Sequence, residues 1–209
     1  MAVNETIVRE FFELHGFLVR QQRKFVAPNA HDEEEIDFVV LNPHAAPVPD
    51  EPLPFVLSST ALARVESAVV AVRGWHSETF SPRRLAHSPE LFRFAEEAVF
   101  APAARALGGA RCPLKILVVP ALPQAEALRS QSIELLRRHG VDAVIPFPTA
   151  LADLVAHVET NRNYQKSELL QTLRVLKNYG FLREPQLELF RPRCRSRGVP
   201  PPASPQFPR

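Results

Sequence analysis

The spacing of apolar residues switches along the chain between a helical period and strand alternation, and it predicts ten elements in the order αβββαβαβαα. In the first half, Asn4 is expected to cap a helix that Gly16 ends. Strands are then expected over residues 17–26, 36–41 and 68–73, with a short helix over 59–66. The third strand consists of apolar residues only as far as Val72, which is typical of a strand buried on both faces.

In the second half, helices and strands alternate. Ser88 and Pro89 start a helix that Pro102 should kink or shorten, and Thr149 caps a later one. The remaining expected elements are strands over 114–119 and 141–147 and helices over 124–139 and 164–179. This alternation predicts parallel strands joined by right-handed crossovers, and hence an α/β fold with a mixed central sheet flanked by helices in three layers.

The length of 209 residues favours one domain with appendages. We expect an α/β core over residues 1–160, a C-terminal amphipathic helix and extension over 161–190, and a disordered tail over 191–209. The 21 prolines concentrate in that tail and in the loop 43–54, so the body itself is not proline-rich. The tail cannot bury enough apolar surface to offset the entropy of ordering it.

The formal charge of +2 conceals an asymmetry. Residues 191–209 hold five arginines and no acid, which leaves 20 Lys and Arg against 23 Asp and Glu in the rest. A strongly basic body would indicate a nucleic-acid-binding protein, so local patches must carry that hypothesis instead. No apolar run approaches 18 residues, and the first helix is acidic, so neither a membrane span nor a signal peptide is expected. Two cysteines, Cys112 and Cys194, fit a reducing cytoplasm.

Three segments together suggest a family. Residues 4–17 read NETIVREFFELHGF, residues 35–39 read EIDFV, and residues 69–74 read VVAVRG. This pattern resembles the PD-(D/E)XK restriction-endonuclease-like and Holliday-junction-resolvase-like superfamily, over about residues 4–120. The resemblance implies an αβββαβ core, here with a C-terminal helical extension. It also implies that Glu5, Asp37 and a Glu-x-Lys pair on the third strand surround one or two divalent metals.

The residues themselves support part of that chemistry. Phosphodiester hydrolysis of this kind needs hard oxygen ligands for Mg²⁺ or Mn²⁺, and Asp37 lies between two apolar neighbours, where a carboxylate requires a partner or a metal. Asp37 could equally be a solvated acid at a strand edge beside the acidic turn. Glu5 is the second candidate ligand, although an acid in the first helical turn also simply complements the helix dipole.

The third strand departs from the pattern. Ala71 stands where the second carboxylate belongs, and Arg73 stands where the lysine belongs. Arginine keeps the charge and can bind phosphate, but it is a poor proton acceptor. We therefore expect weakened or absent cleavage, unless Glu66 or Glu78 substitutes as a ligand. On this reasoning, Ala71→Glu with Arg73→Lys should restore activity.

Two further segments suit nucleic acid. The chain after the third strand carries the only tryptophan, Trp75, followed by His76, Arg83 and Arg84. On the last expected helix, Arg162, Lys166, Arg174 and Lys177 fall within one arc and form a basic stripe. A tryptophan that covers the core and a solvated helix face are the structural alternatives.

Two functions remain open from the sequence. The first is a nucleic-acid-associated protein of nuclease-like fold, binding DNA rather than RNA, with an altered site around Asp37 and Arg73. The second is a non-enzymatic scaffold that binds a protein partner, and an active endonuclease with a relocated glutamate is a further alternative. A nucleotide-binding P-loop or dinucleotide fold is excluded because the chain has only seven glycines and no Gly-rich phosphate loop.

Overall fold

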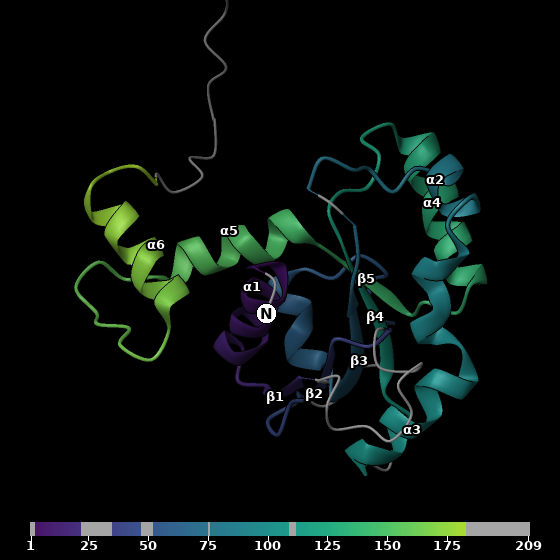
Figure 1. Cartoon of the computed structure of the whole chain (residues 1–209), viewed down its shortest axis with the longest axis horizontal. Coiled ribbons are helices and arrows are strands. Elements are labelled where there is room, and N and C mark those ends of the chain that lie inside the picture. The colour runs from purple at the N-terminus through teal and green to yellow at the C-terminus, as the bar shows by residue number, and fades with distance from the viewer. Residues whose placement is uncertain (1–2, 22–34, 47–51, 75, 109–111, 183–209) are drawn as a thin grey trace, which may run out of the picture.

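The computed structural model describes residues 3–21, 35–46, 52–74, 76–108 and 112–182. Within them a five-stranded sheet lies between two layers of helices, as Figure 1 shows with the sheet in the middle. The expected three-layer α/β architecture with a mixed sheet is thereby confirmed. The strands are β1 (Leu18–Gln21), β2 (Phe38–Leu41), β3 (Ser67–Val72), β4 (Leu114–Val119) and β5 (Ala143–Pro146).

The strands lie in chain order across the sheet. β1, β2 and β3 pair antiparallel, whereas β3, β4 and β5 pair parallel. The register places Phe38 opposite Val70 and Ala71 beside Leu117. Because β3, β4 and β5 run the same way, their carboxyl ends meet at one edge of the sheet, where open α/β sheets bind their ligands.

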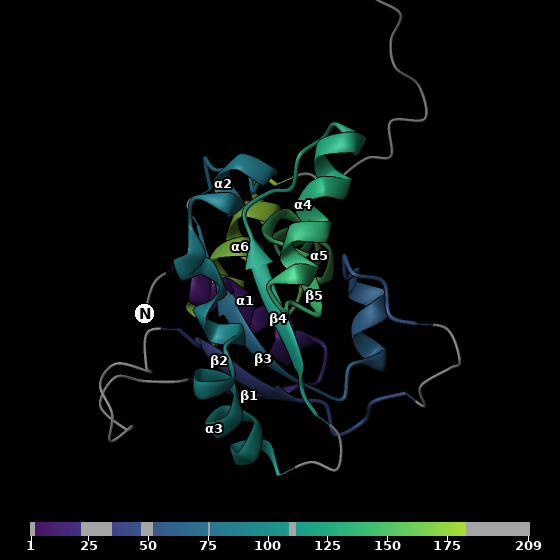
Figure 2. The ribbon, with the colours of Figure 1, turned by 90° about the vertical axis from the view of Figure 1, so that its right-hand side faces the viewer.

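Two hydrophobic clusters cover the two faces of the sheet. One face packs against α1, η1 and α5, with α6 on the outer side of α1 and α5, and the other face packs against α2, η2, α3 and α4 (Figures 1 and 2). Alternate residues of one strand enter opposite clusters: Val70 belongs to the first and Ala71 to the second. The helices are α1 (Val3–Leu14), η1 (Ser59–Arg64), α2 (Pro82–Ala86), η2 (Pro89–Ala95), α3 (Glu97–Leu107), α4 (Glu126–Arg138), α5 (Phe147–His157) and α6 (Glu168–Asn178).

The helix expected after Ser88 is interrupted. Residues 89–95 form the 3₁₀ helix η2, the backbone of Glu96 is extended, and α3 then contains Pro102 in its interior. Packing explains the 3₁₀ turn, because Leu91 and Phe94 are buried at a spacing of three residues, which a 3₁₀ helix places on one side. The sequence did not predict the short helix α2.

Several element boundaries also differ from the expected ones. α5 begins at Phe147, so Thr149 lies inside it rather than capping it, and Ser167 caps α6 instead of the helix starting at Tyr164. Asn4 lies within α1 rather than capping it. Strand β2 begins at Phe38, one residue after Asp37, and residues 22–26 of the first expected strand lie outside the described part.

The C-terminal helix α6 packs on the same core as the rest of the chain, because Leu173 belongs to the first cluster. The tail 191–209, including Cys194, lies outside the described residues. Within the described part, no helix combines the length and the apolar character needed to span a bilayer.

Candidate functional site

The expected site residues lie at the carboxyl end of β3. Arg73 directly follows that strand, and Gly74 then turns the chain with a positive φ of 88°. A Cβ at Gly74 would approach the Phe80 ring to 2.8 Å and Pro120 to 2.9 Å, so only glycine fits this turn. Asp37 reaches the same point from the end of the segment that leads into β2, because its N–H donates to the carbonyl of Val70 on β3.

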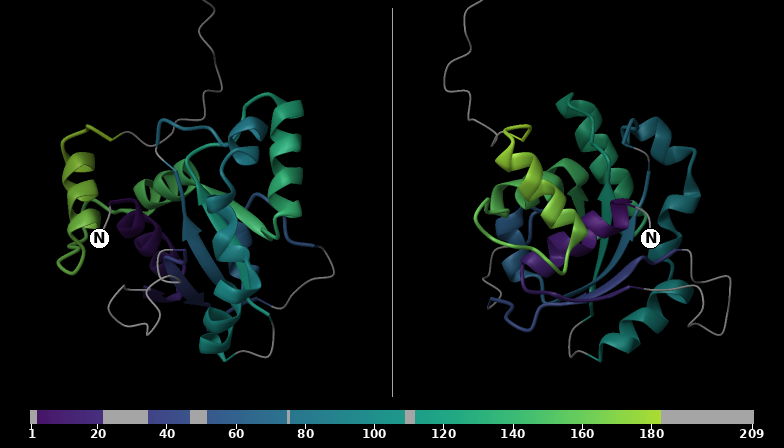
Figure 3. Two further views of the ribbon diagram at one scale, coloured as in Figure 1. Left: turned by 45° about the vertical axis from the view of Figure 1, so that its right-hand side comes forward. Right: turned by 60° about the vertical axis from the view of Figure 1, so that its left-hand side comes forward.

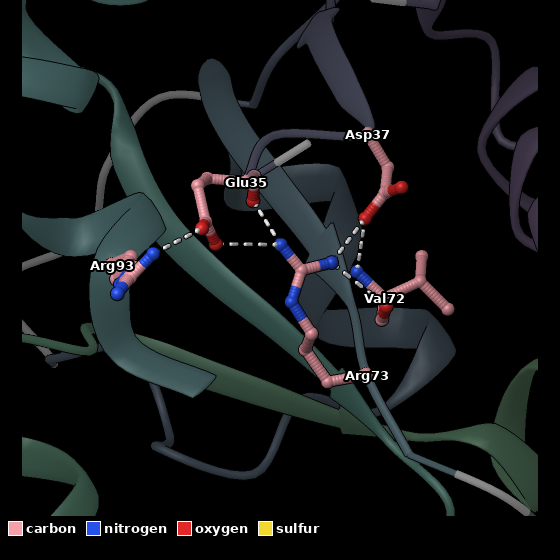
Figure 4. A network of polar contacts seen from close by, with 5 residues as sticks. All are labelled: Glu35, Asp37, Val72, Arg73 and Arg93. Atoms are coloured by element: carbon pink, nitrogen blue, oxygen red, sulfur yellow. Dashed lines mark hydrogen bonds and ion pairs between the residues drawn. The ribbon is translucent and has the colours of Figure 1, made fainter. Parts of the chain in front are cut away.

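Asp37 and Arg73 form a direct ion pair (Figure 4). The Oδ2 atom of Asp37 accepts from Nη1 of Arg73 at 2.8 Å and from the backbone N–H of Val72 at 2.7 Å. Both side chains are mostly buried, with exposed fractions of 17% for Asp37 and 16% for Arg73. The charge-assisted bond and the backbone bond together hold the carboxylate against the end of β3.

Glu35 and Arg93 extend this pair into a network (Figure 4). Nη2 of Arg73 donates to the backbone carbonyl of Glu35, and it lies 3.5 Å from the Glu35 carboxylate. Nη1 of Arg93, on η2, lies 3.5 Å from the other oxygen of that carboxylate. Arg73 is therefore fixed by acids on two sides and is not presented to solvent as an unpaired cation.

Burial has the largest influence on the pKa of Asp37 and raises it above its ordinary value. The charge of Arg73 and the hydrogen bond from Val72 lower that pKa, and the nearby charge of Glu5 raises it. The net direction is upward. Glu5, near the start of α1, accepts from Gln21 of β1, and Gln21 pairs with Phe38, the residue after Asp37. Glu5 therefore lies near the Asp37–Arg73 pair.

The donor set does not fit a divalent metal. Oδ2 of Asp37 already accepts two hydrogen bonds, and Oε2 of Glu5 accepts from Nε2 of Gln21 at 3.0 Å. The third ligand position, Ala71, has no oxygen and an exposed fraction of 0%. In the described part of the chain, no three His, Cys, Asp or Glu side chains are placed to hold a metal ion.

Comparison of the chain with family models, curated proteins and solved structures gave no match.

The two glutamates considered as substitute ligands lie at different distances from the pair. Glu66 precedes β3 and Arg73 follows it, so the whole strand separates them, roughly 20 Å at about 3.3 Å per residue. Glu78 lies close to the end of β3, because its Oε2 would be 3.1 Å from a Cβ at Gly74, and its Oε1 is 3.3 Å from the guanidinium of Arg84. Glu66 is therefore excluded as a replacement, whereas Glu78 lies beside the pair in an ion pair with Arg84.

The segment after β3 follows the site along the same edge. His76 is exposed; its Nε2 lies 2.7 Å from Oδ1 of Asn4, and its ring centroid lies 4.4 Å from that of Phe147. Arg83 and Arg84 are exposed on α2. Trp75 lies outside the described residues. His76 therefore joins the starts of α1 and α5 at the edge that holds the pair.

The expected basic stripe does not exist as one helix face. Arg162 and Lys166 precede α6, where both are exposed. Arg174 donates from Nε to the carbonyl of Thr160 at 2.9 Å. Lys177 donates from Nζ to the carbonyls of Val155 and Val158, at 2.9 and 2.8 Å. Arg174 and Lys177 are therefore partly buried and bound to backbone carbonyls of the fold, whereas Arg162 and Lys166 are exposed.

Lys177→Met should lower the free energy of unfolding by about 1–2 kcal/mol, because two carbonyls at the end of α5 would be left without a charged donor. Methionine keeps an apolar stem of similar length, so the change isolates the ammonium. Urea denaturation measures the effect. Lys166→Met is the matched control, and it should change stability by less than about 0.5 kcal/mol. Equal stability of the two variants would contradict the capping role of Lys177.

Sequence reasoning missed three members of the site. Glu35 looked like part of a solvated acidic turn, although it lies two residues before Asp37 and so falls on the same side of an extended chain. Gln21 and Arg93 gave no signal, because their partners lie 16 and 58 positions away along the chain. Only a three-dimensional pairing reveals them.

Proposed function

We propose that this chain binds nucleic acid at the carboxyl edge of β3, β4 and β5 and does not cut it by a metal-dependent route. The observation that supports the absence of cutting is the Asp37–Arg73 ion pair, which engages the carboxylate that a cutting member of the superfamily resembled by the sequence would keep free for a metal. Binding at this edge is supported by the exposed side chains of His76 and Arg83. The proposal keeps the nuclease-like fold as its premise.

The absence of cleavage follows from the donor set. Hydrolysis would require an accessible hard ligand cluster and a group that positions water. Asp37 is engaged by two protein donors. An arginine such as Arg73 is a poor acceptor for the proton of an attacking water. Mg²⁺ or Mn²⁺ is accordingly no part of the proposed activity.

Binding would rely on groups around the pair, since the pair itself is internally neutralised. Arg83 is exposed, makes no ion pair within the described residues, and lies on α2, which follows the segment after β3. His76 is exposed at the edge itself. Cationic and imidazole donors of this kind contact phosphate oxygens and position a strand without reading its sequence.

Binding of labelled duplex, branched and single-stranded DNA over a salt series, with Mn²⁺ present, tests both halves of the proposal. We expect binding that weakens with salt, and intact DNA. The double variant His76→Ala/Arg83→Ala should weaken binding and flatten the slope of log K against log salt by about 0.9 for each duplex phosphate that the protein no longer neutralises. Arg138→Ala, on α4, is the control and should leave that slope unchanged.

Two results would overturn the proposal. Mn²⁺-dependent cutting that disappears in Asp37→Ala would show that the pair opens to hold a metal. Absence of binding to every DNA form at low salt would remove nucleic acid as the partner.

A specific observation favours the second candidate, a scaffold that binds a protein partner. Three large apolar side chains are exposed around the end of α6: Val175, Tyr179 and Phe181, with exposed fractions of 41%, 76% and 77%. Exposed apolar side chains that gather in one place are typical of a protein-binding surface. Failure of all DNA forms to bind would favour this alternative.

A further inference from the structure

A half-open cavity of about 530 Å³ lies between α1, the end of α5 and the segment 162–167 that leads into α6. Figure 3 shows α6 beside α1, although about 150 residues separate them in sequence. Apolar residues of the lining are Leu14 at the end of α1, Leu154 and Val158 at the end of α5, and Leu170 on α6. Leu154 and Val158 are buried, so Leu14 and Leu170 provide the accessible apolar surface. The volume of the cavity falls within the range of roughly 300–1,000 Å³ that is typical of small-ligand sites.

The wall between α1 and α6 is held by hydrogen bonds. Glu10 is buried, and its Oε1 accepts from Oγ of Ser167 at 2.7 Å. The same Oγ accepts from the backbone N–H of Leu170 at 3.2 Å, which caps α6. The start of α6 is therefore fixed to α1, and the cavity is part of the packed structure.

Cations line the cavity on two sides. Arg162 and Lys166 are exposed on the segment before α6 and make no ion pair with any described residue. Across from them, Arg9 of α1 lies 3.5 Å from Glu10 and 3.6 Å from Glu13. The Nε of Arg9 is buried and has no hydrogen-bond partner in the described part of the chain. Three cations against two acids leave the lining with a net positive charge.

The polar residues between those cations add hydrogen-bonding groups. Asn163 and Gln165 line the cavity, and each side-chain amide both donates and accepts. The run Asn161–Lys166 thus combines amides, an aromatic ring and two cations over an apolar surface. Unstacked bases are bound by this combination, with the base on apolar surface, its edge on polar groups and its phosphate on cations.

We propose that this cavity holds one unstacked nucleotide of a bound strand, with the base against Leu14 and Leu170 and the phosphate between Arg162 and Lys166. The inference rests on the proposed function and names a second contact point for the same strand. An apolar carboxylate would use the cations and the apolar lining, but it would leave the exposed amides of Asn163 and Gln165 to water. A nucleotide also offers these amides the polar edge of its base.

Titration of the full chain with adenosine 5′-monophosphate, followed by NMR, tests the cavity without a strand. Adenosine, ribose 5-phosphate and octanoate are the matched probes that lack the phosphate, the base and both, respectively. We expect the nucleotide to bind at least about ten-fold more tightly than each of them. Equal binding of ribose 5-phosphate would reduce the cavity to a phosphate site, and equal binding of octanoate would make it a site for apolar anions; either result overturns the proposal.

Two variants separate charge from shape. Arg162→Ala/Lys166→Ala should weaken nucleotide binding at least about ten-fold. Arg105→Ala/Arg138→Ala, on the other face of the sheet, removes the same charge and should change it less than two-fold. Leu14→Trp leaves the charge unaltered and fills the opening from a residue that is 38% exposed, so folding should persist. It should also weaken binding at least about ten-fold, and unaltered binding would contradict the location.

The same variants distinguish this inference from the proposed function. If DNA binds and neither the nucleotide nor the cavity variants have any effect, the cavity proposal fails and binding at the strand edge stands. If the nucleotide binds but no DNA form does, the proposed function fails while the cavity remains a nucleotide site, which overturns the role of the cavity in holding a strand.

Discussion

Arg73→Met should lower the free energy of unfolding at pH 7 by about 3 kcal/mol, because it leaves two mostly buried carboxylates without their shared cation. Asp37 and Glu35 have exposed fractions of 17% and 15%, so water replaces the guanidinium only in part. Arg93 still lies beside Glu35, which leaves Asp37 as the more affected acid. Urea denaturation of the variant and the parent protein at pH 7 measures the loss.

The loss of stability caused by Arg73→Met should become smaller as the pH falls. Burial already raises the pKa of Asp37, and Arg73 is the largest influence that lowers it, so removing Arg73 raises this pKa further. A carboxyl group whose pKa is raised by folding stabilises the protein below its unfolded pKa, and that contribution is lost as the pH rises through the folded pKa. The difference between variant and parent should therefore be smaller near pH 4 than at pH 7.

The Asp37→Asn background provides the control. The amide oxygen of the introduced asparagine can still accept from the N–H of Val72, but position 37 then carries no buried charge. Arg73→Met should therefore cost about 1–2 kcal/mol less in this background than in the parent protein. If the loss were the same at both pH values and in both backgrounds, the ion pair would contribute nothing, and the stem of Arg73 would act only through packing.

The strands were predicted well where burial on both faces leaves a mainly apolar run, which in β4 is interrupted only at Lys115. β4 has the expected bounds, and β3 differs from expectation by one residue at each end. Helix boundaries were less predictable where packing competes with local signals. Thr149 was a suitable cap by residue type, yet α5 starts two residues earlier, because Phe147 is buried in the core.

The candidate site was likewise predicted only in part. The resemblance to the nuclease-like superfamily implied that Glu5, Asp37 and Arg73 share one site, and the structure joins Asp37 directly to Arg73. The hydrogen bonds that occupy the Asp37 carboxylate were not predicted, because they come from residues that are 35 and 36 positions away along the chain. The role of Lys177 was also predicted wrongly. Helical spacing placed it on an exposed stripe, but its ammonium donates to two carbonyls at the end of α5.

The burial of Ala71 reverses the expectation drawn from the sequence that Ala71→Glu with Arg73→Lys would restore cleavage. Ala71 has an exposed fraction of 0% and lies in the second cluster, beside Leu117 of β4. Glutamate there would add volume to a packed core and bury a carboxylate. We expect Ala71→Glu to lower the free energy of unfolding by at least about 3 kcal/mol.

Ala71→Gln separates the two causes, because it adds almost the same volume without a charge. If Ala71→Glu destabilises more than Ala71→Gln at pH 7 and the gap closes near pH 4, the buried charge accounts for the difference. The double variant Ala71→Glu/Arg73→Lys should leave DNA intact with Mn²⁺ present. Cutting by a folded double variant, abolished by adding Asp37→Ala, would show instead that the side chain at position 71 can leave the core and reach the Asp37 carboxylate. In that case, the packing around β3 would not explain why the unmodified chain leaves DNA intact.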